Sequence, residues 1–71
     1  MLTMKVLITG GSGFIGKSTA EVLQKNGLQV RVYDLLPSTL PGVESVQGDV
    51  LVFEQLEKAM QGCDAIVHLA A

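Results

Sequence analysis

The stretch from Thr9 to Gly16 reads Thr-Gly-Gly-Ser-Gly-Phe-Ile-Gly and directly follows a short apolar run. Backbone N–H groups in such a turn can approach an anion closely, because glycine has no Cβ. We expect Gly10 to allow a tight turn, Gly13 to let N–H groups reach a diphosphate, and Gly16 to let the next helix pack close to a sheet. The N-terminus of that helix would add unpaired N–H groups and a positive dipole end. The stretch therefore predicts a phosphate-binding turn.

One acidic residue, Asp34, follows about 20 residues later, at the end of a second predicted strand. A carboxylate at this position can accept hydrogen bonds from ribose hydroxyls, and it repels a phosphate attached to the ribose. No Lys or Arg occurs between residues 32 and 57 to bind such a phosphate. The combination predicts a dinucleotide site that favours NAD over NADP. The alternative is that Asp34 only begins a loop as an Asx residue.

A rival pattern covers Gly11 to Ser18, which matches the P-loop of nucleotide triphosphate-binding proteins. There Lys17 would hold the β- and γ-phosphates, and Ser18 would hold magnesium. Two bulky apolar residues, Phe14 and Ile15, would then lie inside the phosphate cradle. We instead expect the helix to begin near Phe14, with an apolar stripe facing the core. That stripe comprises Ile15, Thr19, Val22 and Leu23.

The elements that must position these residues follow from the hydrophobic patterning. Strands are predicted at residues 5–9, 29–34, 43–46 and 65–69, and helices at residues 14–26 and from 53 to a stop at Gly62. Residues 35–42 hold both prolines and form a crossover that is either compressed or contains a single helical turn. Alternating strands and helices predict an α/β fold with a parallel sheet in the order 3-2-1-4, a partial Rossmann (doubly wound) fold. Leu51 and Val52 leave the second helix without a polar cap.

Composition excludes several classes of function. The chain has 71 residues, a net charge of −2 and 48% hydrophobic residues, so neither nucleic acid nor a membrane is an expected partner. No apolar run is long enough for a signal peptide or a membrane span. Lone Cys63 cannot form an internal disulfide, and with His68 alone it cannot build a metal site. A reducing, cytoplasmic setting is predicted.

Four segments together resemble the extended short-chain dehydrogenase/reductases, and more narrowly the NAD-dependent epimerase/dehydratase group. They are Thr9–Gly16, Asp34, Gly48-Asp49 and His68–Ala71. The resemblance covers essentially the whole chain but only an N-terminal part of such an enzyme. It implies NAD as cofactor and an oxidoreductase or isomerase that acts on a nucleotide sugar or a related alcohol.

The resemblance also implies roles for individual residues. The glycines would form the diphosphate turn, Asp34 would bind the adenosine ribose, and the residues after Gly48 would flank the adenine. The implied cofactor-binding residues are Gly10, Gly13, Phe14, Ile15, Gly16, Asp34, Asp49, Val50, Leu69, Ala70 and Ala71. Asp49 has the alternative of a simple Asx turn. Tyr33 is expected to cover apolar surface, His68 to be a packed strand residue, and Cys63 to be a small apolar residue or a loop thiol.

The proton-transfer pair of this family, Tyr-x-x-x-Lys, does not occur, because Tyr33 is the only tyrosine and Pro37 stands four residues later. We therefore expect residues 1–71 to be the N-terminal portion of an NAD(P)-binding domain, with the substrate and catalytic segments elsewhere and no turnover from this portion alone. The alternative is a regulatory module that binds NAD without catalysis. The strand Ala65–Leu69 is expected to be an exposed apolar edge, which leads to pairing with a second copy or to aggregation unless a partner or a further segment covers it.

Overall fold

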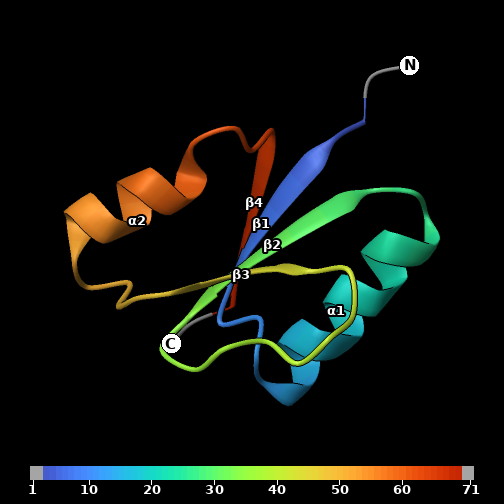
Figure 1. Ribbon diagram of the computed structural model, residues 1–71, viewed down its shortest axis with the longest axis horizontal. Coiled ribbons are helices and arrows are strands. Elements are labelled where there is room, and N and C mark those ends of the chain that lie inside the picture. The colour runs from blue at the N-terminus through green and yellow to red at the C-terminus, as the bar shows by residue number, and fades with distance from the viewer. Residues whose placement is uncertain (1–2, 70–71) are drawn as a thin grey trace.

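The computed structural model describes residues 3–69, which form four strands and two helices in the predicted β-α-β-β-α-β order. The elements are β1 (Lys5–Thr9), α1 (Phe14–Lys25), β2 (Gln29–Asp34), β3 (Glu44–Gln47), α2 (Phe53–Met60) and β4 (Ala65–His68). The two helices lie on opposite faces of the sheet (Figure 1). Neither helix is long and apolar enough to cross a membrane.

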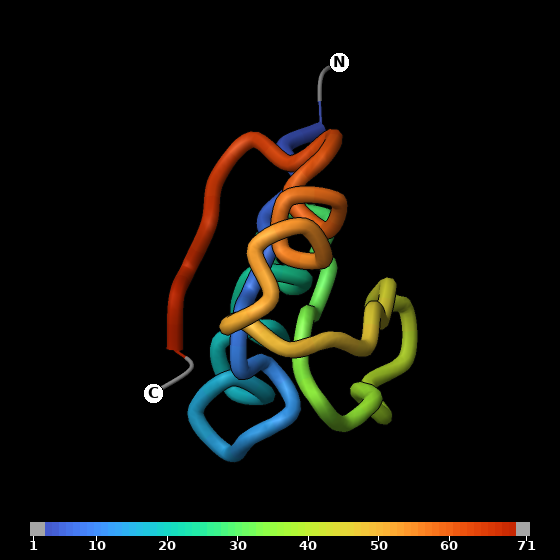
Figure 2. The backbone as a smooth tube through the Cα atoms, turned by 90° about the vertical axis from the view of Figure 1, so that its left-hand side faces the viewer, coloured from blue at the N-terminus to red at the C-terminus, as the bar shows by residue number. Residues whose placement is uncertain are grey.

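The strands form one parallel sheet in the order β3-β2-β1-β4. Thr9, at the end of β1, lies opposite Tyr33 of β2 on one side and opposite His68 of β4 on the other. Figure 2 shows β4 at one edge of the sheet, far from the segment around β3. This is the strand order of the first half of a Rossmann fold, as the sequence predicts.

Alternate side chains of the sheet form two separate cores, one under each helix. Beneath α1 the buried core residues are Val6, Ile8, Ala20, Val30 and Val32. Beneath α2 they are Leu7, Tyr33 and Ala59. Because β1 contributes to both cores, its end is held firmly at the place where the glycine-rich turn begins.

The predicted core face of α1 is confirmed for Leu23 and wrong for Ile15 and Val22. Gly16 and Ala20 are the buried residues of this helix, and Leu23 packs against the core beside them. Ile15 and Val22 are instead 68% and 58% exposed. Gly16 lies close to the turn at Gly10 and Gly11, and Ala20 packs on the sheet, so the helix face that carries these two small residues turns Ile15 and Val22 outward.

Three smaller differences concern element boundaries. β3 runs one residue later than predicted, and β4 ends at His68, so that Leu69 lies outside the strand. Within residues 35–43 the crossover has no helical turn, which answers the question the sequence left open in favour of a compressed loop. Gly42, with a φ of +78°, makes the turn that leads into β3. As predicted, α2 begins after Val52 without a side-chain cap.

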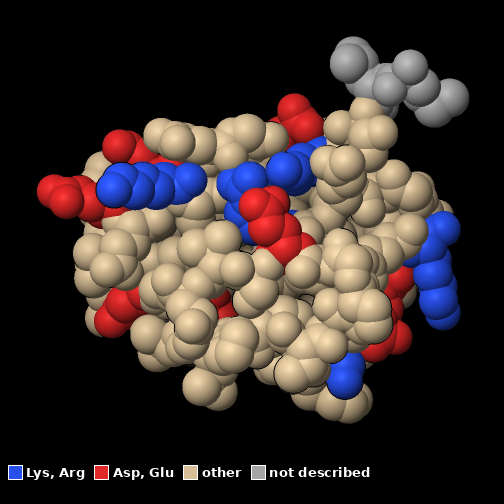
Figure 3. Space-filling view, in the orientation of Figure 1, with Lys and Arg blue, Asp and Glu red and all other residues tan. Residues whose placement is uncertain are grey.

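A guanidinium group fastens α2 to the sheet. Arg31 Nη1 donates hydrogen bonds to the carbonyl oxygens of Ala59 and Gln61, at 2.7 and 2.6 Å, and thereby satisfies acceptors at the end of α2. Arg31 Nε donates to Glu44 Oε1 at 3.0 Å, and Lys5 Nζ lies 3.4 Å from the same oxygen. Figure 3 shows acidic and basic side chains next to one another in a band across the upper part of one face.

Candidate dinucleotide-binding site

The glycine-rich turn leads from the buried end of β1 into the start of α1. Gly10 has a φ of +77°, and its N–H donates to the carbonyl oxygen of Tyr33 at 3.0 Å. Gly13 is the N-cap of α1, no side chain caps the helix, and its first turn holds no acidic residue. The N–H groups of this first turn therefore present partial positive charge to an anion placed beyond it.

The three glycines at 11, 13 and 16 differ in the space that surrounds them. A Cβ on Gly16 would lie 2.5 Å from the carbonyl oxygen of Gly10, so this position enforces the close approach of helix and turn. A Cβ on Gly13 would lie 3.7 Å from that oxygen, an ordinary contact. Gly11, for which the sequence predicts no role, leaves no room for a side chain, because a Cβ there would lie 2.7 Å from a methyl of Val32. Its only sequence signal is the glycine pair directly after β1.

The turn forms one side of a cavity of about 340 Å³. Its lining residues are Gly10, Gly13, Phe14, Ile15, Gly16 and Leu69. All six are predicted cofactor-binding residues, so the fold brings the predicted diphosphate turn together with the segment after β4. The predicted residues Ala70 and Ala71 lie outside the described residues.

A second cavity, of about 260 Å³, also has Gly10 in its lining. It is lined by Gly10, Tyr33, Asp34, Leu35, Gly48, Asp49, Val50 and Leu51. The three residues predicted to contact the adenosine are among them. Because Gly10 lines both cavities, the two form adjoining parts of one site at the carboxyl ends of the strands, where ligands bind in open α/β sheets.

The Asp34 carboxylate faces the glycine-rich turn. Its Oδ2 accepts a hydrogen bond from the Ser12 N–H at 3.2 Å, and its Oδ1 accepts one from the Leu36 N–H at 3.3 Å. The second bond is the Asx geometry considered as the alternative, so Asp34 begins a loop and also faces the site. A carboxylate has about four acceptor positions, which leaves capacity for ribose hydroxyls.

Asp49 is held by hydrogen bonds on both sides of its backbone. Its N–H donates to Gln55 Oε1 at 3.2 Å, and its carbonyl oxygen accepts from the Tyr33 hydroxyl at 2.8 Å. Its side-chain Oδ1 accepts from the Leu51 N–H at 2.9 Å, which confirms the Asx turn. The Asx turn occupies Oδ1 of Asp49, and the residue also lines the second cavity.

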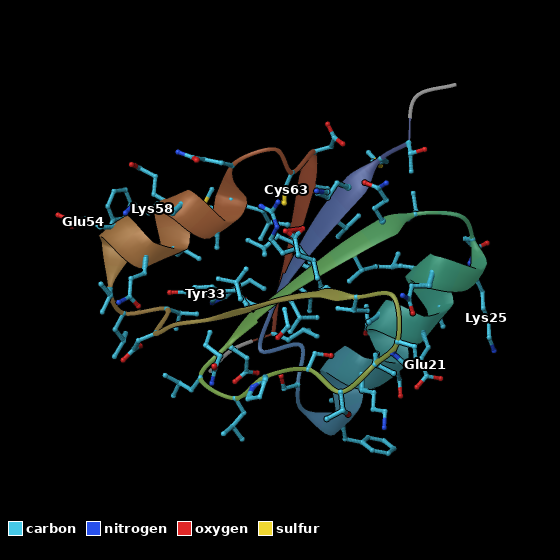
Figure 4. All side chains as sticks on the ribbon, in the orientation of Figure 1. Glu21, Lys25, Tyr33, Glu54, Lys58 and Cys63 are labelled. Atoms are coloured by element: carbon cyan, nitrogen blue, oxygen red, sulfur yellow. The ribbon has the colours of Figure 1, made fainter. Side chains whose placement is uncertain are left out.

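Tyr33 differs from its prediction as a cover for apolar surface. It is completely buried, its ring packs against Gly48, and its hydroxyl reaches the segment that leads to α2 (Figure 4). Burial raises the pKa of this phenol above its ordinary value of 10.0, and the nearby charge of Asp49 raises it further. Sequence patterning shows that this position is apolar in character, but not that its hydroxyl has a partner.

The pattern that defines the NAD-dependent epimerase/dehydratase family matches residues 6–71. The chain belongs to this family. It is 41% identical over 70 residues to a 3-beta-hydroxysteroid dehydrogenase from Mycolicibacterium neoaurum, an alignment that covers 94% of this chain and 19% of that protein. It is 38% identical over 71 residues to human short-chain dehydrogenase/reductase family 42E member 1, covering 93% of this chain and 18% of that protein.

Solved structures agree with this membership of the epimerase/dehydratase family. UDP-glucose 4-epimerase from Brucella ovis, in complex with NAD, superimposes with a TM-score of 0.86 at 35% identity, covering 97% of this chain and 23% of that one. Uronate dehydrogenase from Agrobacterium tumefaciens, a mutant complexed with NAD, gives a TM-score of 0.80 at 33% identity, covering 96% and 26%. The chain thus spans about a fifth to a quarter of the length of these proteins.

The P-loop alternative does not fit this family member. Helix α1 begins at Phe14, so Lys17 and Ser18 lie within the helix and both are exposed. In a P-loop these two residues hold phosphates and magnesium at the turn itself. Within residues 3–69 no group of three or more His, Cys, Asp or Glu residues is arranged to hold a metal ion.

His68 and Cys63 stand apart from the two cavities. His68 is exposed, unlike the packed strand residue predicted, and its Nδ1 lies 2.5 Å from the hydroxyl of buried Thr9. Cys63 is half-buried, with its sulfur 3.6 Å from Arg31 Nη1. Both residues take part in contacts between elements of the fold.

Proposed function

We propose that this chain binds NAD, with the adenosine in the cavity of Asp34 and Asp49 and the diphosphate at the turn from Gly10 to Gly16. One observation carries the proposal. Gly10 lines both cavities. The uncapped N-terminus of α1 borders one of them, and the carboxylate of Asp34, which is suited to a ribose, borders the other. The exposed position of Gly13 and the absence of acid in the first turn of α1 fit a diphosphate.

Each residue binds or orients a part of the cofactor. Asp34 accepts from the hydroxyls of the adenosine ribose and repels the extra phosphate of NADP, so NAD is preferred. Asp49 accepts from the amino group of the adenine, and Val50 flanks the ring. Leu69, with Ala70 and Ala71, lines the middle of the cofactor toward the nicotinamide ribose. Bound NAD supplies a hydride acceptor at its nicotinamide ring.

We also propose that residues 1–71 are the N-terminal portion of the NAD(P)-binding domain of a cytoplasmic epimerase, dehydratase or dehydrogenase, whose substrate is a nucleotide sugar or a related alcohol. The named activities of the relatives support this range, since they include a steroid dehydrogenase and a UDP-glucose 4-epimerase. In each of these substrate classes the group that loses hydride is an alcohol carbon.

The outer edge of β4 is proposed to pair with a second copy of the chain. Ile66 and Leu69, on and just after this strand, are 45% and 39% exposed, and unpaired strand edges favour pairing between chains. Light scattering over a range of concentrations tests this proposal. A mass equal to one chain at every concentration would contradict it.

The cofactor proposal is tested by titrating the ¹⁵N-labelled chain with NAD, with NADP, and with ATP plus magnesium. We expect NAD to shift the amide signals of residues 10–16, 34 and 48–50, and NADP to bind more weakly. Lys17→Ala, which alters an exposed residue of the rival pattern, is expected to leave NAD binding unchanged. Shifts that occur only with ATP plus magnesium and disappear in Lys17→Ala would overturn the proposal.

A further inference from the structure

The adenine side of the site rests on a buried hydroxyl. Tyr33 is 0% exposed, and its hydroxyl donates to the carbonyl oxygen of Asp49 at 2.8 Å. That carbonyl also accepts from the Val52 N–H at 3.0 Å, and the Asp49 N–H is bound by Gln55 Oε1. The peptide groups on both sides of Asp49 are therefore held by hydrogen bonds from Tyr33 and from residues at the start of α2.

The ring of Tyr33 fixes the neighbouring residue as well. A Cβ placed on Gly48 would collide with the hydroxyl oxygen of Tyr33, so glycine is required where the backbone crosses the ring. The Gly48 N–H donates to the carbonyl oxygen of Asp34 at 2.9 Å. The turn that carries Asp49 is thus positioned by the ring and hydroxyl of Tyr33 and by the backbone carbonyl of Asp34.

The backbone of Tyr33 reaches the other half of the site. Its carbonyl oxygen accepts from the Gly10 N–H at 3.0 Å, at the first residue of the diphosphate turn. One residue therefore contacts Gly10 through its backbone and Gly48 and Asp49 through its side chain, and all four line the second cavity.

We propose that Tyr33 is a positioning residue for recognition of the adenine base: its hydroxyl sets the height of the Gly48-Asp49 turn, so that Asp49 meets the amino group of adenine. This inference rests on the proposed binding of NAD. It assigns to the chain a determinant of base selectivity that does not itself touch the base.

Selectivity is measured with AMP and IMP, which share the ribose phosphate and differ at the base. AMP carries an amino donor at the position where IMP carries an oxygen acceptor. The carboxylate of a correctly positioned Asp49 therefore favours AMP, and we expect the original chain to bind AMP about tenfold more tightly than IMP. Tyr33→Phe keeps the ring over Gly48 and removes only the hydroxyl. We expect this variant to lower the affinity for AMP. The ratio of the affinity for AMP to the affinity for IMP should fall to about twofold or less.

A matched control is Asn26→Ala, which also removes a side-chain donor to a backbone carbonyl, the 2.7 Å bond from Asn26 Nδ2 to the oxygen of Val22 at the far end of α1. Its AMP-to-IMP ratio should equal that of the original chain. A merely structural role for Tyr33 would weaken AMP and IMP equally.

Calorimetric titration of the three chains with AMP, IMP and NAD separates the possible failures. An unchanged AMP-to-IMP ratio in Tyr33→Phe, or an equal loss for both nucleotides, overturns the role of Tyr33 and leaves NAD binding intact. An original chain that binds neither AMP nor NAD overturns the proposed function and this inference together. A selective loss for AMP in Tyr33→Phe alone supports both.

Discussion

The backbone N–H of Ser12 donates a hydrogen bond to Oδ2 of Asp34 over 3.2 Å, and this bond joins the glycine-rich turn to the end of β2. The Ser12 hydroxyl strengthens the same junction by donating to the carbonyl oxygen of Leu36 at 2.7 Å. The carboxylate is therefore oriented by the protein itself. A ligand that contacts it needs to order few side chains on binding.

Replacing Asp34 by Asn is expected to weaken NAD binding by about tenfold, because a neutral amide is a poorer acceptor than a carboxylate for ribose hydroxyls. Discrimination against NADP should fall at the same time, since the repelling charge is lost. Calorimetric titration with both cofactors measures the two effects. Glu21→Gln, at an exposed position of α1, is the control for a change of net charge. Equal NAD affinities for Asp34→Asn and the original chain would contradict the assignment.

Alanine at Gly16 and at Gly13 should give opposite results. At Gly16 the added Cβ would lie 2.5 Å from the Gly10 oxygen, and we expect a loss of stability of about 2–3 kcal/mol. At Gly13 the contact is an ordinary 3.7 Å, so stability should be nearly preserved while the methyl group narrows the space for a diphosphate. Urea unfolding measures the first effect and NAD titration the second. Equal stability of the two variants would refute this division of roles.

Acidification is expected to weaken the contact between Glu44 and the Arg31 guanidinium. The hydrogen bond from Arg31 lowers the pKa of Glu44 below 4.5, with a further contribution from the charge of Lys5. A lowered pKa in the folded state adds stability above the unfolded pKa, and this stability is lost as pH falls through the folded value. The effect should stay below about 1 kcal/mol, because the Glu44 side chain is half exposed.

Urea unfolding at about pH 6 and at about pH 3 measures the Glu44 contribution. The Glu44→Gln variant should lose less stability between these values than the original chain does. Glu57→Gln, at an exposed position of α2, controls for the removal of one carboxylate. Identical losses in all three chains would show that the contact with Arg31 adds nothing.

Alkaline titration reports directly on the burial of Tyr33. It is the only tyrosine, and the chain has no tryptophan, so phenolate absorbance follows this residue alone. Because the pKa of Tyr33 is raised in the folded state, its contribution to the stability of the fold is fully present below the ordinary value of 10.0. This contribution is lost as pH rises through the higher pKa of the folded state. We expect the absorbance change above 10.0, together with unfolding. A transition at or below that value would be inconsistent with a buried phenol.

Sequence patterning predicts the fold because buried parallel strands, glycine turns and helix stops each have a local signal. The strand order and the start of α1 at Phe14 both follow from such signals. The buried face of α1 could not be predicted from hydrophobicity, since its contact depends on the small size of Gly16 and Ala20 rather than on apolar area. A residue that matters for its lack of a side chain leaves little trace in an apolar pattern.

The same limit applies to the site. Spacing predicts Gly10, Gly13 and Asp34 as site residues because the roles proposed for them follow from a known turn geometry, and the structure places them in the lining of two adjoining cavities. The contact of Tyr33 with Asp49 joins residues 16 positions apart on different elements. Gly11 likewise depends on Val32 of the neighbouring strand. Such partners are set by register between strands, which a single sequence does not display.

The two neighbours of β1, which is one of the two inner strands of the sheet, are translated at very different times. β2 follows β1 after a single helix, whereas β4 is the last element described, and its loop joins β1 through a bond between residues 59 positions apart. A nascent chain on the ribosome therefore carries β1 with one bare edge until nearly all of these residues have been translated. Until then, the backbone N–H and C=O groups of β1 that pair with β4 in the finished sheet remain open to pairing with another chain.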